Sequence, residues 1–122
     1  IIGQIEDLFQ PYDLLQSAGN IIIQYTAALT AIDVNRGGDK RSHLAINIEA
    51  AQEIARQIRL RNIGGIIAID FLKFQSKKDE EEVLAALEKA ILKDPCTIQI
   101  HGRTAAGLVE LTRKRRTPPL QD

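Results

Sequence analysis

The amino-acid sequence predicts an α/β fold, in which two to three helices pack on a layered, mixed β-sheet of about five strands. Short runs of β-branched apolar residues have the length of strands, and amphipathic stretches with helical spacing lie between them. No internal repeat or low-complexity segment interrupts this alternation. The chain has 122 residues, enough for a single core of Ile, Leu, Val and Ala, so we expect one domain over residues 1–122.

The N-terminal third predicts one helix and two strands. Apolar residues recur at helical spacing over residues 2–9 and predict a short helix that ends near Gln10. Two runs rich in β-branched and aromatic residues, 21–26 and 29–35, predict neighbouring strands. Residues 36–42 are polar, charged and glycine-bearing, and we expect an exposed loop there.

The middle of the chain predicts an amphipathic helix followed by a strand. Apolar residues fall on one stripe over residues 44–60, with charged residues off it. The stripe consists of Ile48, Ala51, Ile54, Ala55 and Ile58. Residues 62–65 break the helix, and residues 66–71 are apolar except for Asp70, as expected of a strand covered on both faces.

A second helix and one or two strands follow. Ser76 and Asp79 have the spacing of a capping box and predict a helix start, and residues 93–95 end this helix. Residues 97–100 predict a short strand. Residues 107–112 fit either a strand or the start of a helix, and we expect the basic tail after them to leave the domain.

Composition excludes several classes of protein. With 16 basic and 16 acidic residues the formal net charge is zero, which excludes a uniformly basic nucleic-acid binder. The single cysteine, Cys96, forms no disulfide within the chain and builds no Cys-based zinc site alone. No apolar run approaches the ~20 residues of a transmembrane helix, so we expect a soluble protein. The start at Ile1 and the absence of methionine indicate a piece of a longer polypeptide, without a signal peptide.

Two strands of the predicted sheet carry a carboxylate after a run of apolar residues. Asp33 and Asp70 each stand at the carboxyl end of such a run, where ligands gather in open α/β sheets. A hard cation, Mg²⁺ or Mn²⁺, is a suitable shared partner, and Asn35 would point to the same face as Asp33. The alternative is that each Asp forms a turn or caps the following helix. Spacing alone leaves both interpretations open.

Basic residues gather near the C-terminus. Arg113, Lys114, Arg115 and Arg116 are consecutive, and without further context they describe a solvated surface tail. Together with Arg103 they would instead form a phosphate-contact strip. Few aromatic residues are present for base stacking, so base-specific readout has little support.

Four stretches of the sequence strongly resemble the catalytic core of the bacterial ribonuclease E/G family. They are LTAIDVN at 29–35, NIEAAQEIARQIRLR at 47–61, GGIIAIDF at 64–71 and GLVELTRKR at 107–115. The resemblance runs in the family's order from Gly19 to Leu120 and departs from it at Lys73, at Ala105–Ala106 and in a shorter loop after Asn35.

The resemblance implies a metal-binding, DNase I-like catalytic subdomain. In the family, two aspartates bind catalytic Mg²⁺ and an asparagine supports them; the matching positions are Asp33, Asp70 and Asn35. It further implies a cytoplasmic endoribonuclease that cleaves single-stranded RNA by attack of metal-activated water and leaves 5′-phosphate and 3′-hydroxyl ends. Mn²⁺ is a possible substitute for Mg²⁺.

Nothing in the sequence resembles the family's S1 domain, 5′-end sensor or paired-cysteine zinc link. We therefore expect no zinc in this chain and no membrane partner. The expected partners are single-stranded RNA, the missing domains of a longer protein and, in a homo-oligomer, further copies of the chain. The alternative function is a catalytically idle RNA-binding or scaffold domain, and a third is an assembly module whose exposed strand edges pair with missing segments.

Overall fold

The computed structural model describes residues 13–14 and 19–115, so the helix expected over residues 2–9 lies outside the described residues. The elements are β1 (Asp13–Leu14), β2 (Asn20–Tyr25), β3 (Thr30–Asn35), α2 (His43–Leu60), β4 (Gly65–Asp70), α3 (Lys77–Ile91), β5 (Thr97–Arg103) and β6 (Val109–Lys114). The predicted α/β class is confirmed: within the described residues, five strands of six or seven residues, extended by the two-residue β1, form one mixed sheet with two helices.

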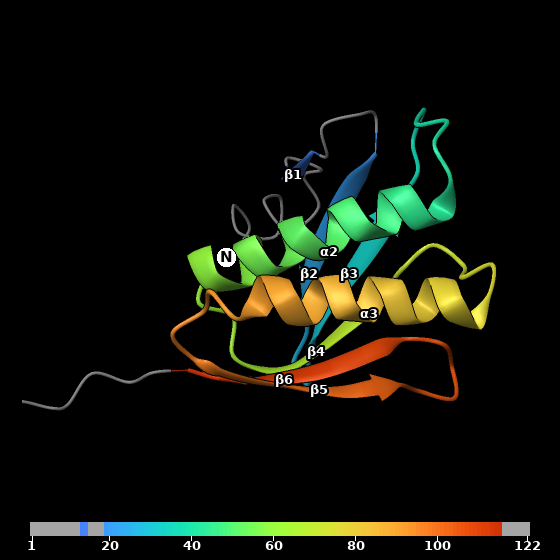
Figure 1. Cartoon of the computed structure of the whole chain (residues 1–122). Helices are drawn as coiled ribbons and strands as arrows, with labels where there is room; N and C mark the ends of the chain where they lie inside the picture. Colours follow the sequence, from blue (N-terminus) through green and yellow to red (C-terminus); the bar gives the residue numbers. More distant parts are fainter. Residues whose placement is uncertain (1–12, 15–18, 116–122) are drawn as a thin grey trace, which may run out of the picture.

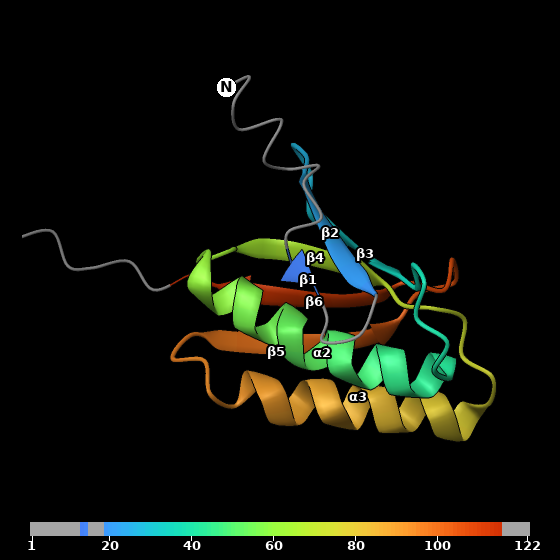
Figure 2. The ribbon, with the colours of Figure 1, turned by 90° about the horizontal axis from the view of Figure 1, so that it is seen from above.

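The strands are ordered β1-β2-β3-β4-β6-β5. Strands β2 and β3 form an antiparallel hairpin. The chain then crosses over by way of α2, so that β4 lies parallel to β3. Strand β6 runs antiparallel to β4, and β5 closes the far edge beside β6. Both helices pack on the same face of the sheet (Figures 1 and 2). The opposite face, which we call the open face, has no helix over it in the described part of the chain.

Alternate residues of the strands form the core against the helices. Ile32 and Ile67 from the central strands and Ile54 from α2 are almost completely buried, as strand and helix periodicity predict. Ser76 caps α3 as expected, because its side chain accepts a hydrogen bond from the backbone N–H of Asp79. Over the described residues, neither helix is long and apolar enough to cross a membrane.

Strand β4 corrects one prediction. Its continuous apolar run suggested cover on both faces, yet Ile66 is 40% exposed and Asp70 is exposed. The reason is that both helices lie on one side, so only the residues that alternate with Ile66 and Asp70 meet them. An apolar run therefore does not reveal how many layers cover a strand.

The C-terminal segment corrects a second prediction. The ambiguous stretch at 107–112 becomes β6, and this strand continues to Lys114 where a departing tail was expected. Arg113 pairs with Gly65 across the sheet, and the residue is only 3% exposed. Arg113 therefore belongs to the interior of the domain.

The loop after β3 is less exposed than its composition suggested. Asp39 is buried, and its carboxylate accepts hydrogen bonds from the backbone and side chain of Arg41. The same guanidinium reaches Glu49 on α2, while Arg36 donates to the carbonyls of Asp39 and Arg41. These hydrogen bonds from Arg41 lower the pKa of Asp39 to about 2. The prediction of a wholly exposed loop was wrong at Asp39, because a paired charge is stable in a buried position.

Candidate metal centre on the open face of the sheet

Asp33 and Asp70 are direct partners in the parallel pairing of β3 and β4. Both belong to the open face, since their strand neighbours Ile32 and Ile69 are buried toward the helices. Side chains at matched positions of adjacent strands leave the sheet about 5 Å apart. The structure therefore brings together the two carboxylates that the sequence singled out; we call them the acid pair.

The electrostatics of the acid pair are those of like charges held side by side. Desolvation by surrounding groups raises the pKa of Asp33, and the charge of Asp70 and a hydrogen bond with its carboxyl raise it further. Two adjacent carboxylates resist full ionisation, because each charge disfavours the other. A bound cation would remove this conflict.

The donor set fits a hard divalent ion. Within the described residues, no group of three or more His, Cys, Asp and Glu side chains gathers as a metal cage. Mg²⁺ is typically held by one or two carboxylates and keeps water or substrate phosphate at its other positions. Two carboxylates on an exposed sheet face match that requirement, whereas a soft-metal site with thiolate or imidazole ligands does not fit.

Asn35 lies two residues beyond Asp33 and shares the open face with it. Its side-chain Nδ2 donates a hydrogen bond to Oδ1 of Asn20 on β2, at 3.3 Å. Asn20 and Asn35 are partners in the β2–β3 ladder, so the contact ties neighbouring strands. This hydrogen bond ties the amide of Asn35 to β2, on the same face of the sheet as the acid pair.

Arg113 does not contribute a surface charge. Its Nε and Nη2 donate to the two carboxylate oxygens of Asp94 at 2.9 and 3.0 Å. Its Nη1 donates to Oδ1 of Asn62 at 2.8 Å and to the carbonyl of Ile63 at 3.1 Å. The side chains of Arg113 and Asp94 are 2% and 1% exposed. We call these four residues the Arg113 cluster, and its role is structural.

The other basic residues occupy opposite ends of the sheet. Arg103 pairs with Val109, which pairs with Ile69, so Arg103 lies at the end that carries Asp70. Its guanidinium is 5.8 Å from the centre of the Phe74 ring. Lys114 and Arg115 follow Arg113 at the other end and are exposed, and Arg116 lies outside the described residues. The predicted strip is therefore not one continuous surface.

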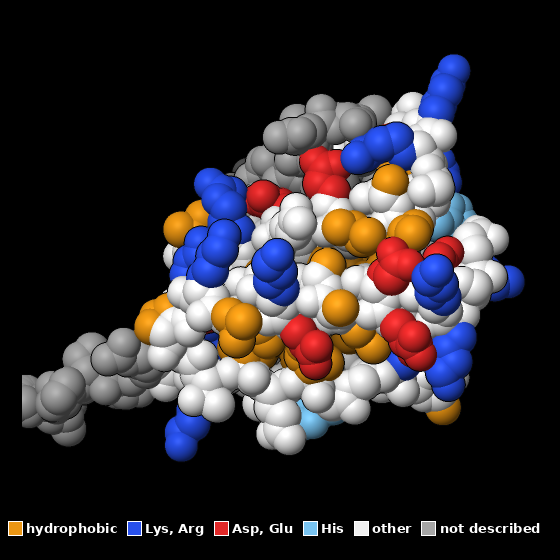
Figure 3. Space-filling view, viewed as in Figure 1, with side chains coloured by type: hydrophobic (Ala, Val, Ile, Leu, Met, Phe, Trp, Pro, Cys, Tyr) orange, Lys and Arg blue, Asp and Glu red, His pale blue; other side chains and the backbone are white. Residues whose placement is uncertain are grey.

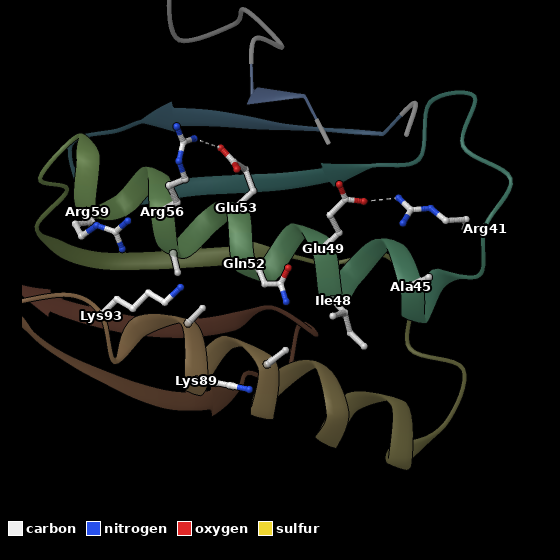
Figure 4. A pocket seen from close by; sticks show the side chains of 13 residues that line it. Arg41, Ala45, Ile48, Glu49, Gln52, Glu53, Arg56, Arg59, Lys89 and Lys93 are labelled. Atoms are coloured by element: carbon white, nitrogen blue, oxygen red, sulfur yellow. Dashed lines mark hydrogen bonds and ion pairs between the residues drawn. The ribbon is translucent and has the colours of Figure 1, made fainter. Parts of the chain in front are cut away.

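A groove between the two helices lies on the far side of the sheet from the acid pair. It lies between α2 and α3, has a volume of about 1040 Å³ and mixes small apolar side chains with charged ones (Figures 3 and 4). Arg56 forms an ion pair with Glu53 at 2.9 Å, and Arg59 and Lys89 stand in the last turns of their helices. Cations in that position stabilise the helix dipole, so the groove needs no ligand to explain its charges.

Sequence reasoning missed two buried polar side chains that the fold depends on. Asn47 is fully buried and hydrogen-bonds the backbone of Leu72, and Asp94 is the partner of Arg113. A polar residue on the buried stripe of a helix was the available signal for Asn47. Nothing local marked Asp94, because its partner is 19 residues away.

Comparison with known proteins supports the resemblance seen in the sequence. A model of the ribonuclease E/G family matches residues 1–116. Ribonuclease E of Nostoc sp. is 48% identical over 122 residues, which cover 95% of this chain and 18% of that protein. Ribonuclease E of Escherichia coli (strain K12) is 44% identical over 126 residues, covering 98% of this chain and 12% of the relative.

Ribonuclease G of Escherichia coli (strain K12) is 47% identical over 107 residues, covering 83% of this chain and 22% of the relative. This chain thus spans less than a quarter of the length of each of these three relatives. The match nevertheless extends over nearly all of its own sequence, including both strands of the acid pair. The chain belongs to the ribonuclease E/G family.

Proposed function

We propose that this chain is the metal-binding catalytic part of an endoribonuclease that hydrolyses single-stranded RNA and leaves 5′-phosphate and 3′-hydroxyl ends. The observation that carries the proposal is the acid pair, Asp33 beside Asp70 on an exposed sheet face. The relatives named ribonuclease E and ribonuclease G support the substrate class.

In this proposal Asp33 and Asp70 hold Mg²⁺, with Mn²⁺ as a substitute. An ion held there would lower the pKa of a bound water and would neutralise negative charge on the phosphate under attack. The two carboxylates balance the charge of the ion and fix its place on the sheet. Asn35, held by Asn20, offers its amide to orient a carboxylate or the scissile phosphate.

The proposed RNA contacts differ at the two ends of the sheet. The side chain of Arg103 is 44% exposed, and its Nη1 lies 3.5 Å from Oε1 of Glu80. This ion pair is long, and a phosphate can replace the carboxylate. It lies at the same end as the acid pair and is our first candidate for a phosphate contact. Lys114 and Arg115 would contact RNA away from the reacting bond, Arg116 stays a candidate contact outside the described residues, and we leave Arg113 out because it is buried.

The proposal is tested with Asp33→Asn and Asp70→Asn, each compared with Glu88→Gln, which removes an exposed carboxylate on α3. Mn²⁺ binding is followed by the electron paramagnetic resonance of the free ion. Cleavage of a labelled single-stranded RNA is followed with Mg²⁺. We expect both Asp variants to lose binding and cleavage and Glu88→Gln to retain the behaviour of the unchanged chain.

A second candidate function is an idle RNA-binding or scaffold domain. It is favoured by the small number of acidic ligands, since within the described residues the two carboxylates are not joined by a third His, Cys, Asp or Glu side chain. It predicts RNA binding that weakens with salt, without turnover and without any effect of Mg²⁺ or of the Asp variants. That outcome would replace the catalytic proposal.

A further inference from the structure

The two members of the acid pair are supported differently by the sheet. Asp33 lies inside β3, with Ile22 of β2 on one side and Asp70 of β4 on the other. Asp70 is the last residue of β4, and the pairing of β4 with β6 ends one residue earlier, at Ile69 and Val109. One side of Asp70 therefore lacks a strand partner.

Two residues beyond Asp70, a side chain from α2 hydrogen-bonds the backbone in place of a strand partner. Nδ2 of Asn47 donates to the carbonyl of Leu72, and Oδ1 of Asn47 accepts from the N–H of Leu72, both at 2.9 Å. The carboxamide thus pairs with both backbone polar groups of one residue, as a neighbouring strand would. Asn47 is fully buried, so both hydrogen bonds are shielded from water.

The same helix face makes a second contact with this loop. Nδ1 of His43, one turn before Asn47, lies 2.8 Å from the carbonyl of Lys73. Phe71 is buried between Asp70 and Leu72, and its ring contacts Phe74. The backbone that follows Asp70 is consequently held from the helix side while β3 holds Asp70 itself.

We propose that Asn47 is a positioning residue for the acid pair, because it fixes the chain at Leu72 and so keeps the carboxylate of Asp70 beside that of Asp33. The effect on cation binding rests on the proposed function, in which Asp33 and Asp70 hold a metal ion. The structural effect, restraint of the end of β4 by Asn47, can be tested without any metal. Asn47 touches neither the reacting groups nor the cation and acts through the backbone.

The test compares Asn47→Leu with Gln57→Leu in the same chain. Gln57 is a matched control: it is a carboxamide on the same helix, it is 8% exposed, and it makes two side-chain hydrogen bonds, with Glu53 and Arg61. It stands toward the other end of α2. Both variants are compared at a temperature at which circular dichroism shows each to be fully folded.

Two readouts separate positioning from a general loss of stability. Mn²⁺ affinity should fall about tenfold in Asn47→Leu and stay within about twofold in Gln57→Leu, as for other residues that orient metal ligands. Amide hydrogen exchange over residues 69–71 should become at least about tenfold faster in Asn47→Leu alone. Asn47→Ala, which removes both hydrogen bonds and adds neither bulk nor charge to the buried site, should change both readouts in the same direction and provides a second variant if the leucine variant does not fold.

Unchanged Mn²⁺ affinity together with unchanged exchange over residues 69–71 would overturn the proposal and leave Asn47 as a satisfied core residue. Failure of the unchanged chain to bind Mn²⁺ would instead reject the proposed function. In that case the exchange data alone decide whether Asn47 restrains the end of β4.

Discussion

The two ends of strand β4 differ in their charges: opposite charges are paired and buried at one end, and like charges lie side by side at the other. At its first residue, Gly65, the partner strand brings in the Arg113 cluster, where the buried guanidinium donates two hydrogen bonds to the Asp94 carboxylate and two to the neutral oxygens of Asn62 and Ile63. At its last residue, Asp70, the neighbouring strand brings in a second carboxylate of the same sign on an exposed face. At the first end the buried charges of Arg113 and Asp94 neutralise each other, and at the second end two like charges lie side by side, where a bound cation would neutralise them.

This difference separates stability from function within a single sheet. Burial is the largest single influence on Asp94 and would raise its pKa, but the hydrogen bonds from Arg113 and from the Cys96 N–H, together with the charges of Arg113 and Arg59, lower that pKa overall. For Asp33, burial and the charge of Asp70 act in the same direction and raise the pKa. A carboxylate whose environment opposes its charge is a better indicator of a ligand site than one whose environment neutralises it.

Removal of Asp94 should have the largest effect on stability. Asp94→Ala leaves the guanidinium of Arg113 buried without its counter-charge, and we expect a loss of about 3–5 kcal/mol in the free energy of unfolding. Urea denaturation measures it. Glu80→Gln, which removes the exposed 3.5 Å pair with Arg103, should cost less than about 1 kcal/mol. Equal costs for the two variants would contradict the contrast between the ends.

At the end of β4 that carries the acid pair, Asp33→Asn should weaken Mn²⁺ binding without lowering the free energy of unfolding. Without divalent cations the variant should be at least as stable as the unchanged chain, because the substitution removes repulsion between like charges. Mn²⁺ affinity should nevertheless fall about 100-fold or more. Loss of a residue that orients a metal ligand lowers affinity by about 10- to 100-fold, and loss of a direct ligand should cost at least as much. A strongly destabilised variant would show that the pair is structural.

Carboxylates paired with arginine and the unpaired acid pair should also respond oppositely to acid. Asp39 and Asp94 have lowered pKa values in the folded state, so they contribute stability above the ordinary Asp pKa of 3.8, and this is lost as the pH falls through their folded pKa. For Asp39 that pKa is about 2. Asp33 has a raised pKa, so its contribution decreases as the pH rises above 3.8.

Urea denaturation between pH 2 and pH 6, without divalent cations, measures these contributions. In Asp39→Asn, the free energy of unfolding should fall less steeply as the pH is lowered below 3.8 than it does in the unchanged chain. Asp33→Asn should remove the decrease that accompanies deprotonation of the pair. Acid profiles that are identical in both variants and in the unchanged chain would contradict the assignment of these shifts.

The smallest expected effects concern the two glycines beside the Arg113 cluster. A Cβ at Gly64 would come within 2.7 Å of the Arg115 side chain, which is exposed and can move away. Gly65 has φ of +82° and open space around it, so Gly65→Ala is strained by its backbone conformation alone. We expect Gly65→Ala to cost about 1–2 kcal/mol and Gly64→Ala less, by thermal or urea denaturation.

Local patterns predicted most of the secondary structure. The helix at 44–60 and the strands at 21–26 and 29–35 were placed within one or two residues, because their apolar periodicity is strong and their ends carry polar or glycine residues. The stretch at 107–112 stayed ambiguous, since weak alternation does not separate a strand from a helix start. Its pairing with β4 and β5 made it a strand.

The sequence by itself determined the α/β class, the main helices and strands, and the presence of two carboxylates after apolar runs. Only the tertiary structure decided that Asp33 and Asp70 share one register position, that their face is open, and that Arg113 is buried against Asp94. The physical reason is that periodicity reports which side of an element is apolar, a local property. The charge environment of a side chain depends on strand pairing between residues far apart in the chain, and no local pattern encodes it.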